Sequence, residues 1–128
     1  MKTGLKIRVG ELEADAWLNE TGTAARVIEI LPINSSVNVW GEEIYFSIPV
    51  EAGLEDARET VELGDIAYWP RGNALCVFFG STPVSEGDEI RPASPVNIIG
   101  RIEGDSELFH KLLENLKRGE EIAISGQP

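Results

Sequence analysis

A chain of 128 residues has room for one hydrophobic core, so we expect a single domain over residues 1–128 that needs no disulfide or metal for stability. The 22 acidic and 11 basic residues give a net charge of -11, which argues against nucleic acids and anionic membranes as partners. The same charge favours solubility and would also attract a cationic partner. The N-terminus carries no apolar leader and no segment is long enough to span a membrane, so we expect a cytoplasmic protein.

The first half of the chain is predicted to form strands and one short helix. Apolar and polar residues alternate, with the period of a half-buried strand, in four segments: 5–9, 12–16, 37–39 and 44–48. The first two are separated by Gly10-Glu11 and predict a hairpin, and Gly41-Glu42-Glu43 is predicted to be the turn before the fourth. Apolar residues at three- and four-residue spacing predict a helix over 24–31, which Pro32 ends.

The second half opens with an acidic connection over 50–63, which can hold a short strand at 60–62. Two apolar runs follow, 66–69 and 74–79, with turn residues between them. Because these runs do not alternate, we expect both of their faces to be buried, with a helix covering the outside of a barrel. The remaining predicted segments are an irregular loop, a strand, a helix capped by Asp105 or Ser106, and a last strand: 80–95, 96–102, 106–118 and 122–124.

The order of these elements favours an antiparallel sheet, because most consecutive strands are joined by short turns. About eight strands with two helices favour closure into a barrel, since closure removes exposed edges. An open α+β sheet is the alternative architecture.

Four stretches of the sequence carry a resemblance to a known family: 40–46 (WGEEIYF), 64–70 (GDIAYWP), 78–83 (FFGSTP) and 92–100 (PASPVNIIG). They resemble a small prokaryotic family of single-domain cyclophilin-like proteins of unknown function, roughly over residues 5–125. The resemblance implies a mainly β fold, a closed eight-stranded cyclophilin-like β-barrel with two helices.

The signature of the isomerase cyclophilins, Phe-His-Arg and then Phe-x-x-Gln-Gly-Gly, is absent. The one glutamine is Gln127 and the one histidine is His110, which falls on the second predicted helix and is expected at the surface. The resemblance therefore carries over no catalytic residue, and fold alone does not supply function.

Residue types that commonly carry chemistry are sparse. Cys76 lies in an apolar run and is predicted to be an inert core residue. Paired carboxylates such as Glu42-Glu43 are interpreted as solvated turn charges, since none has the full ligand set of a calcium loop. The serines have no histidine partner that would form a catalytic triad, so we expect no metal site, cofactor or catalytic residue.

The best candidate surface combines aromatic and polar residues in the stretches that carry the resemblance. Ligand pockets need an apolar lining with a few fixed polar groups, and Tyr and Trp supply both. The candidate ligand-binding residues are Tyr45, Trp69, Arg71, Phe79, Thr82 and Asn97. The alternative is that the aromatic residues only fill the barrel.

Three functions are open at this point. The first is a binding module that holds a peptide or a small molecule in a cleft at the barrel surface. The second is a peptidyl-prolyl isomerase with a non-standard site that uses Arg71 as its electrostatic group, since isomerisation needs only preferential binding of the twisted amide. The third is an accessory subunit that contacts an enzyme through the loop at 50–63 or at 80–95. The oligomeric state is left open.

Overall fold

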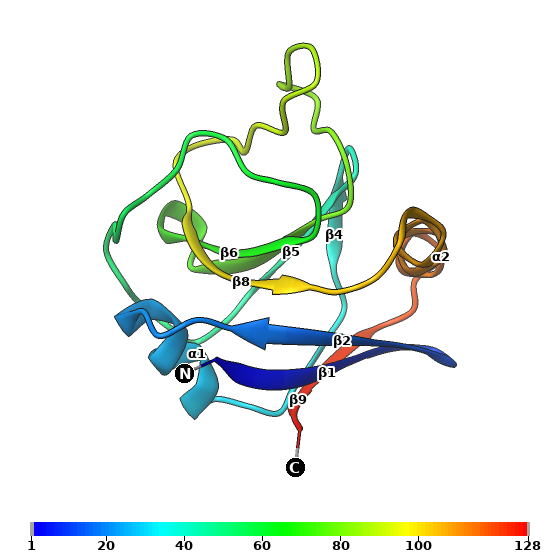
Figure 1. The fold of residues 1–128 in the computed structure, drawn as a ribbon, viewed down its shortest axis with the longest axis horizontal. Helices are drawn as coiled ribbons and strands as arrows, with labels where there is room; N and C mark the ends of the chain where they lie inside the picture. The colour runs from blue at the N-terminus through cyan, green and yellow to red at the C-terminus, as the bar shows by residue number, and fades with distance from the viewer. Residues whose placement is uncertain (1, 128) are drawn as a thin grey trace.

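One antiparallel sheet and two α-helices make up the fold in a computed structural model that describes residues 2–127 (Figure 1). The mainly β prediction with two helices is confirmed. The strands are β1 (Thr3–Val9), β2 (Leu12–Leu18), β3 (Ile33–Ser35), β4 (Asn38–Trp40), β5 (Glu43–Ser47), β6 (Asp65–Trp69), β7 (Ala74–Phe78), β8 (Asn97–Ile102) and β9 (Ile122–Gly126). The helices are α1 (Gly22–Glu29), α2 (Ser106–Lys117) and a 3₁₀ turn, η1 (Pro70–Gly72).

The prediction of a closed eight-stranded barrel is wrong. The described residues form a nine-stranded sheet in the order β3-β9-β1-β2-β8-β6-β7-β5-β4, and no ladder of hydrogen bonds joins its two ends. The end strands β3 and β4 are consecutive in the chain, with only Ser36 and Val37 between them. Strand β3 pairs with β9 and β4 pairs with β5, so the two end strands are linked by the chain but not by hydrogen bonds to each other. The sheet is therefore an open half-barrel.

Local sequence signals explain where the main elements begin. The predicted hairpin is confirmed as β1 and β2, in which Val9 pairs with Leu12. Helix α1 begins after Thr21, whose hydroxyl accepts a hydrogen bond from the Ala24 amide at 3.1 Å. Helix α2 begins after Asp105, whose carboxylate accepts from the Leu108 amide at 2.8 Å.

The concave face of the half-barrel holds the main core. Alternate residues of β1 and β5 point into it, and both helices bury their apolar stripes there through residues such as Val27 and Leu112. Helix α1 lies at one end of the strands and α2 at the other in Figure 1. In the part of the chain that the structure describes, no helix has the length and apolar character to cross a lipid bilayer.

A second, smaller core lies on the opposite face of β6 and β7. Its buried members are Val61, Ala67, Cys76, Phe78 and Val96. Both faces of these strands are buried, as predicted, but the predicted cover is wrong: the connections at 48–64 and 79–96 cover this face, and no helix does. Instead of a strand at 60–62, the connections form isolated bridges between Val61 and Ile90 and between Arg58 and Val96.

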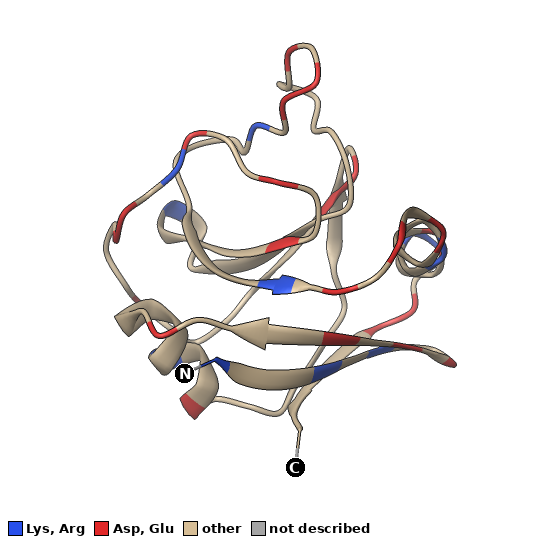
Figure 2. Cartoon of the chain, in the orientation of Figure 1, with Lys and Arg blue, Asp and Glu red and all other residues tan. Residues whose placement is uncertain are grey.

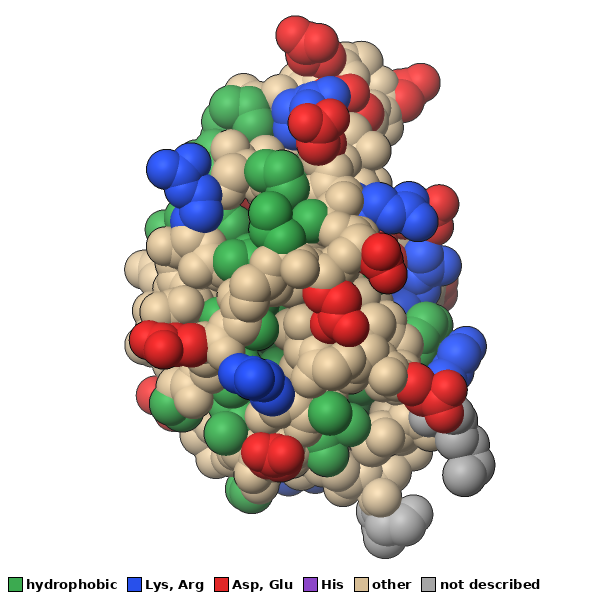
Figure 3. All heavy atoms as spheres, turned by 90° about the vertical axis from the view of Figure 1, so that its left-hand side faces the viewer, with side chains coloured by type: hydrophobic (Ala, Val, Ile, Leu, Met, Phe, Trp, Pro, Cys, Tyr) green, Lys and Arg blue, Asp and Glu red, His purple; other side chains and the backbone are tan. Residues whose placement is uncertain are grey.

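Charge is distributed unevenly over this architecture. Figure 2 shows acidic residues concentrated in the loops that rise above β6 and β7 and on α2. On the face shown in Figure 3, hydrophobic side chains reach the surface between basic and acidic ones. The loops that cover the second core are therefore both acidic and partly apolar.

Candidate functional site

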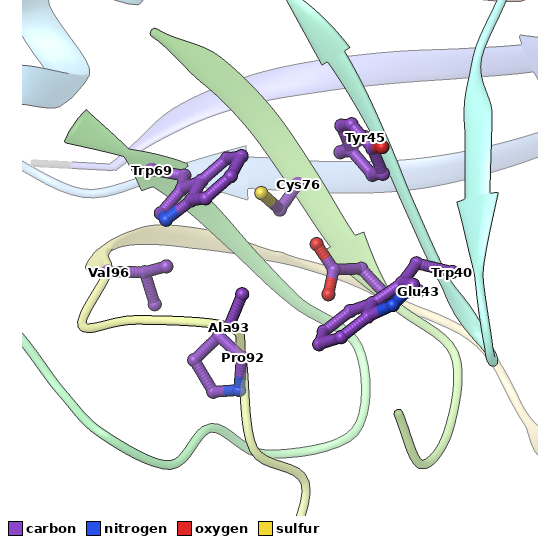
Figure 4. A pocket seen from close by; sticks show the side chains of 8 residues that line it. All are labelled: Trp40, Glu43, Tyr45, Trp69, Cys76, Pro92, Ala93 and Val96. Atoms are coloured by element: carbon purple, nitrogen blue, oxygen red, sulfur yellow. The ribbon is translucent and has the colours of Figure 1, made fainter. Parts of the chain in front are cut away.

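A pocket of about 260 Å³ opens between the second face of the sheet and the loop that precedes β8 (Figure 4). Its lining is largely apolar and aromatic. The lining residues are Trp40, Glu43, Tyr45, Trp69, Cys76, Pro92, Ala93 and Val96.

The alternation of side chains along β5 determines which residues form the floor of the pocket. In β5, Ile44 and Phe46 enter the main core, so Glu43 and Tyr45 point to the other face. Tyr45 pairs with Cys76 on β7, and this register brings a phenol and a thiol side by side. The floor therefore follows directly from the same alternation that builds the core.

Aromatic rings form the walls. The rings of Tyr45 and Trp69 meet edge to face, with centroids 6.2 Å apart and an interplanar angle of 78°. Trp40, from β4, lies beside Glu43 at the other side of the pocket in Figure 4. These three rings are each only partly buried, so part of their surface faces the open space.

The remaining wall is a loop held in place by hydrogen bonds. Trp69 Nε1 donates to Ser94 Oγ at 2.6 Å, which ties an aromatic wall to the loop. Val96 and Arg58 exchange backbone hydrogen bonds of 3.0 and 2.8 Å, which hold the end of the loop. Pro92 and Ala93 are thus positioned without a helix or strand of their own.

Glu43 is the unexpected member of the site. Its side chain is only 5% exposed, and its Oε1 is buried with no hydrogen-bond partner among the described residues. Burial raises the pKa of Glu43 to about 7, an effect that a hydrogen bond from Cys76 partly offsets. The interpretation of Glu42-Glu43 as solvated turn charges is therefore wrong for Glu43, although Glu42 is exposed.

Cys76 is buried, as predicted. Burial and the neighbouring Glu43 carboxyl raise the pKa of its thiol well above the ordinary value. The thiol therefore stays protonated at neutral pH, and a protonated thiol is a poor nucleophile.

The structure brings together two of the six residues proposed from sequence, Tyr45 and Trp69. Arg71 is exposed on η1 and does not line this pocket. Phe79 is buried against Phe109, with ring centroids 5.8 Å apart.

Thr82 and Asn97 make structural hydrogen bonds away from the pocket. The Thr82 hydroxyl donates to the Arg91 carbonyl inside the loop at 82–91. The Asn97 side chain accepts from the Glu55 amide at 2.8 Å and donates to the Gly53 carbonyl at 2.9 Å, which fastens the connection at 53–55 to β8.

Sequence reasoning missed the remaining lining residues for two reasons. Trp40 belongs to the stretch at 40–46 but has no local signal that separates it from an aromatic core residue, and Pro92 and Ala93 lie in a loop with no periodicity to place them. Glu43 had a usable signal, because the alternation that puts Ile44 in the core puts Glu43 beside Tyr45.

Other candidate chemistry is not assembled in the described residues. His110 is exposed on α2, as predicted. Across residues 2–127, no group of three or more His, Cys, Asp or Glu side chains lies close enough to hold a metal ion.

The half-barrel with two helices and a pocket on its second face defines a mainly β domain of the cyclophilin-like class. A family model described as Cyclophilin-like matches residues 3–125, so the chain belongs to this family. The chain is also similar to a solved structure, the hypothetical protein AF2241 from Archaeoglobus fulgidus, with 41% sequence identity and a TM-score of 0.73. That similarity covers 98% of this chain and 95% of the archaeal one. A search of curated proteins finds no match.

Proposed function

We propose that this protein is a binding module that holds a small organic molecule, or one side chain of a peptide, in the aromatic pocket without transforming it. The observation that carries the proposal is the contrast between its aromatic residues. All four phenylalanines are buried in the cores, whereas Trp40, Tyr45 and Trp69 keep exposed surface around a concave space. Large rings left partly uncovered around a pocket are typical of a recognition surface.

The chemistry of the pocket argues against nucleophilic catalysis. Nucleophilic catalysis needs an activated nucleophile beside a base. Here burial and the carboxyl of Glu43 both raise the pKa of the Cys76 thiol, which is the opposite of activation. The pocket therefore offers recognition groups and no activated nucleophile.

Tryptophan fluorescence can test this function directly. The three tryptophans are Trp40 and Trp69 in the pocket and Trp17 on β2, where Lys2 stacks on it at 3.8 Å. In a Trp17→Phe variant, all tryptophan fluorescence comes from Trp40 and Trp69 and therefore reports on the pocket. We expect ligands from a screen of metabolites and proline peptides to change its emission and to raise its melting temperature.

A pair of matched substitutions locates the binding site. Ala93→Trp narrows the pocket and should weaken a ligand found in the screen by about tenfold or more. Ala25→Trp adds the same side chain to the exposed surface of α1 and should leave affinity unchanged. Equal affinities in the two variants, or no ligand in the screen, would contradict the proposed function.

A further inference from the structure

The carboxyl of Glu43 lacks the partner that a buried charge requires. Buried carboxylates are normally paired with a cation or fully hydrogen-bonded, because removal from water is costly. Glu43 Oε1 has neither kind of partner among residues 2–127, and the one donor to this carboxyl is the weak Cys76 thiol. Figure 4 shows the carboxyl directed into the space between the aromatic rings.

The elements around the pocket supply no positive charge. The other lining residues are Trp40 of β4, Tyr45 of β5, Trp69 of β6, Cys76 of β7, and Pro92, Ala93 and Val96 of the loop before β8, and none of them is basic. The basic residue next to this loop segment, Arg91, is engaged by Glu89, with Nε and Oε2 2.7 Å apart. The residues that line the pocket therefore supply no cationic partner for the ionised form of Glu43.

The walls indicate what kind of partner fits. The faces of Trp and Tyr rings attract cations, and cages of aromatic rings are a recurring solution for the recognition of quaternary ammonium groups. Trp40, Tyr45 and Trp69 provide three such rings. The net charge of -11 adds a long-range attraction for cations.

Building on the proposed function, we propose that the pocket takes an organic cation, with an ammonium group held between Trp40, Tyr45 and Trp69 and paired with Glu43. A volume of about 260 Å³ suits a small amine or the head group of a larger molecule. The ammonium can belong to a free amine or to a lysine side chain, and the chemistry that recognises it is the same.

The first experiment compares probes of one shape and different charge. Choline and its neutral isostere 3,3-dimethylbutan-1-ol are titrated into the Trp17→Phe variant and followed by tryptophan fluorescence. We expect choline, or the primary amine n-butylamine, to bind at least about tenfold more tightly than the neutral alcohol. Equal affinity of the charged and neutral probes would overturn the inference.

A second pair of probes distinguishes the source of the ammonium group. Nα-acetyl-lysine amide represents a peptide side chain, and Nα-acetyl-norleucine amide is its uncharged counterpart. Tighter binding of the lysine derivative than of choline and n-butylamine identifies a peptide, and the reverse order identifies a free amine. Either order supports an ammonium site, provided that the charged member of each pair binds better.

The decisive variants carry the same substitution at two adjacent positions, 43 and 42. Glu43→Gln keeps the shape of the side chain, removes its charge and should weaken the charged probes by about tenfold or more. Glu42→Gln removes an exposed charge beside the pocket and should weaken them less than about twofold. Equal losses in the two variants would indicate a general charge effect and overturn the role of Glu43.

The pH dependence gives an independent readout. Because only ionised Glu43 pairs with a cation, and its pKa is about 7, the affinity of choline should rise about 30-fold from pH 5.5 to pH 8.5. Glu43→Gln should flatten this profile. An affinity that is independent of pH in the unsubstituted protein would contradict the inference.

The outcomes separate this inference from the function on which it rests. If neutral ligands from the screen bind in the pocket and are blocked by Ala93→Trp, while the charged probes bind no better than their isosteres, the binding role stands and the cation inference fails. If no probe and no ligand from the screen binds, both fail.

Discussion

At the scale of single residues, Glu43 has a cost that depends on pH. Its folded-state pKa of about 7 lies above the ordinary value of 4.5, so the folded protein binds a proton more tightly than the unfolded chain does. This group therefore destabilises the fold progressively as the pH rises from about 4.5 to about 7, by about 3 kcal/mol in total.

Glu43→Gln should remove this cost. We expect the variant to be about 3 kcal/mol more stable than the unsubstituted protein at pH 8 and nearly equal to it at pH 4.5, as measured by urea unfolding. Glu42→Gln, at an exposed position, is the control and should show a small difference at both pH values. A Glu43→Gln difference that does not change with pH would show that the carboxyl is not held in an unfavourable environment.

Glu43 also shows how far sequence reasoning reaches at this scale. The sequence predicted a turn over 41–43, but the turn consists of Gly41 and Glu42, and Glu43 is the first residue of β5. Gly41 makes this tight turn possible with a φ of +64° and no side chain to collide with the Thr82 Cα, which a Cβ would approach to 2.9 Å. Because the predicted strand boundary was wrong by one residue, the carboxyl of Glu43 was predicted to face solvent, whereas it lies on the floor of the pocket.

At the scale of elements, Asn97 joins β8 to the long connection that precedes β6. Its side chain is 1% exposed and bonds to Glu55, Gly53 and Thr23. Asn97→Ala removes three hydrogen bonds, of which the one to Thr23 is buried and the other two are partly buried, so we expect a loss of about 2–3 kcal/mol in the free energy of unfolding. Asn38→Ala removes an exposed side chain from β4 and should cost less than about 0.5 kcal/mol.

The same pair of variants separates a structural from a ligand-binding role of Asn97. If Asn97 acts only through the connection at 53–55, Asn97→Ala should bind a pocket ligand with unchanged affinity at a temperature where it remains folded. Lost affinity with unchanged stability would instead place Asn97 in a binding site.

Most elements could be predicted because their signals are local. Alternation identified the β1–β2 hairpin, and cap residues with an apolar stripe identified α1 and α2. Strand β3 was missed because Ile33 is its one apolar residue, so the segment shows no alternation. The double burial of β6 and β7 was predicted, but what covers them depends on Val61, Ile90 and Val96, whose contacts are far apart in the sequence.

At the scale of the whole molecule, Gly100 lies where the two halves of the sheet meet. It pairs with Leu18 on β2 and with Ile66 on β6, so β8 connects four strands on one side to four on the other. A Cβ at Gly100 would lie 2.0 Å from the Trp17 carbonyl oxygen, a backbone atom that cannot turn away.

Gly100→Ala should therefore destabilise the entire fold, by at least about 3 kcal/mol, because relief of the contact requires β2 and β8 to separate. Gly126→Ala is the control on β9, where a Cβ would meet no atom within 4 Å. Thermal unfolding followed by circular dichroism measures both, and a Gly100→Ala variant as stable as Gly126→Ala would show that the sheet is more compliant than this packing implies.

Closure of the barrel was the global property that sequence could not supply. Exposed strand edges are unfavourable, and the number of predicted strands is consistent with a barrel. The structure instead ends the sheet with two short strands that share one continuous segment, β3 and β4. Which neighbours such short strands choose is decided by packing over the whole molecule and not by their own residues.

That shared segment also affects how copies of the chain meet one another. A partner strand adding to either border would find only three residues to pair with, and at the β4 border two of them, Asn38 and Val39, carry solvent-facing side chains. Edge strands of three residues offer few backbone hydrogen-bonding groups to an added strand. They therefore disfavour intermolecular strand addition, the first step of amyloid-like polymerisation. The short edge strands thus limit intermolecular strand pairing. A closed barrel achieves the same protection because it has no edge strands.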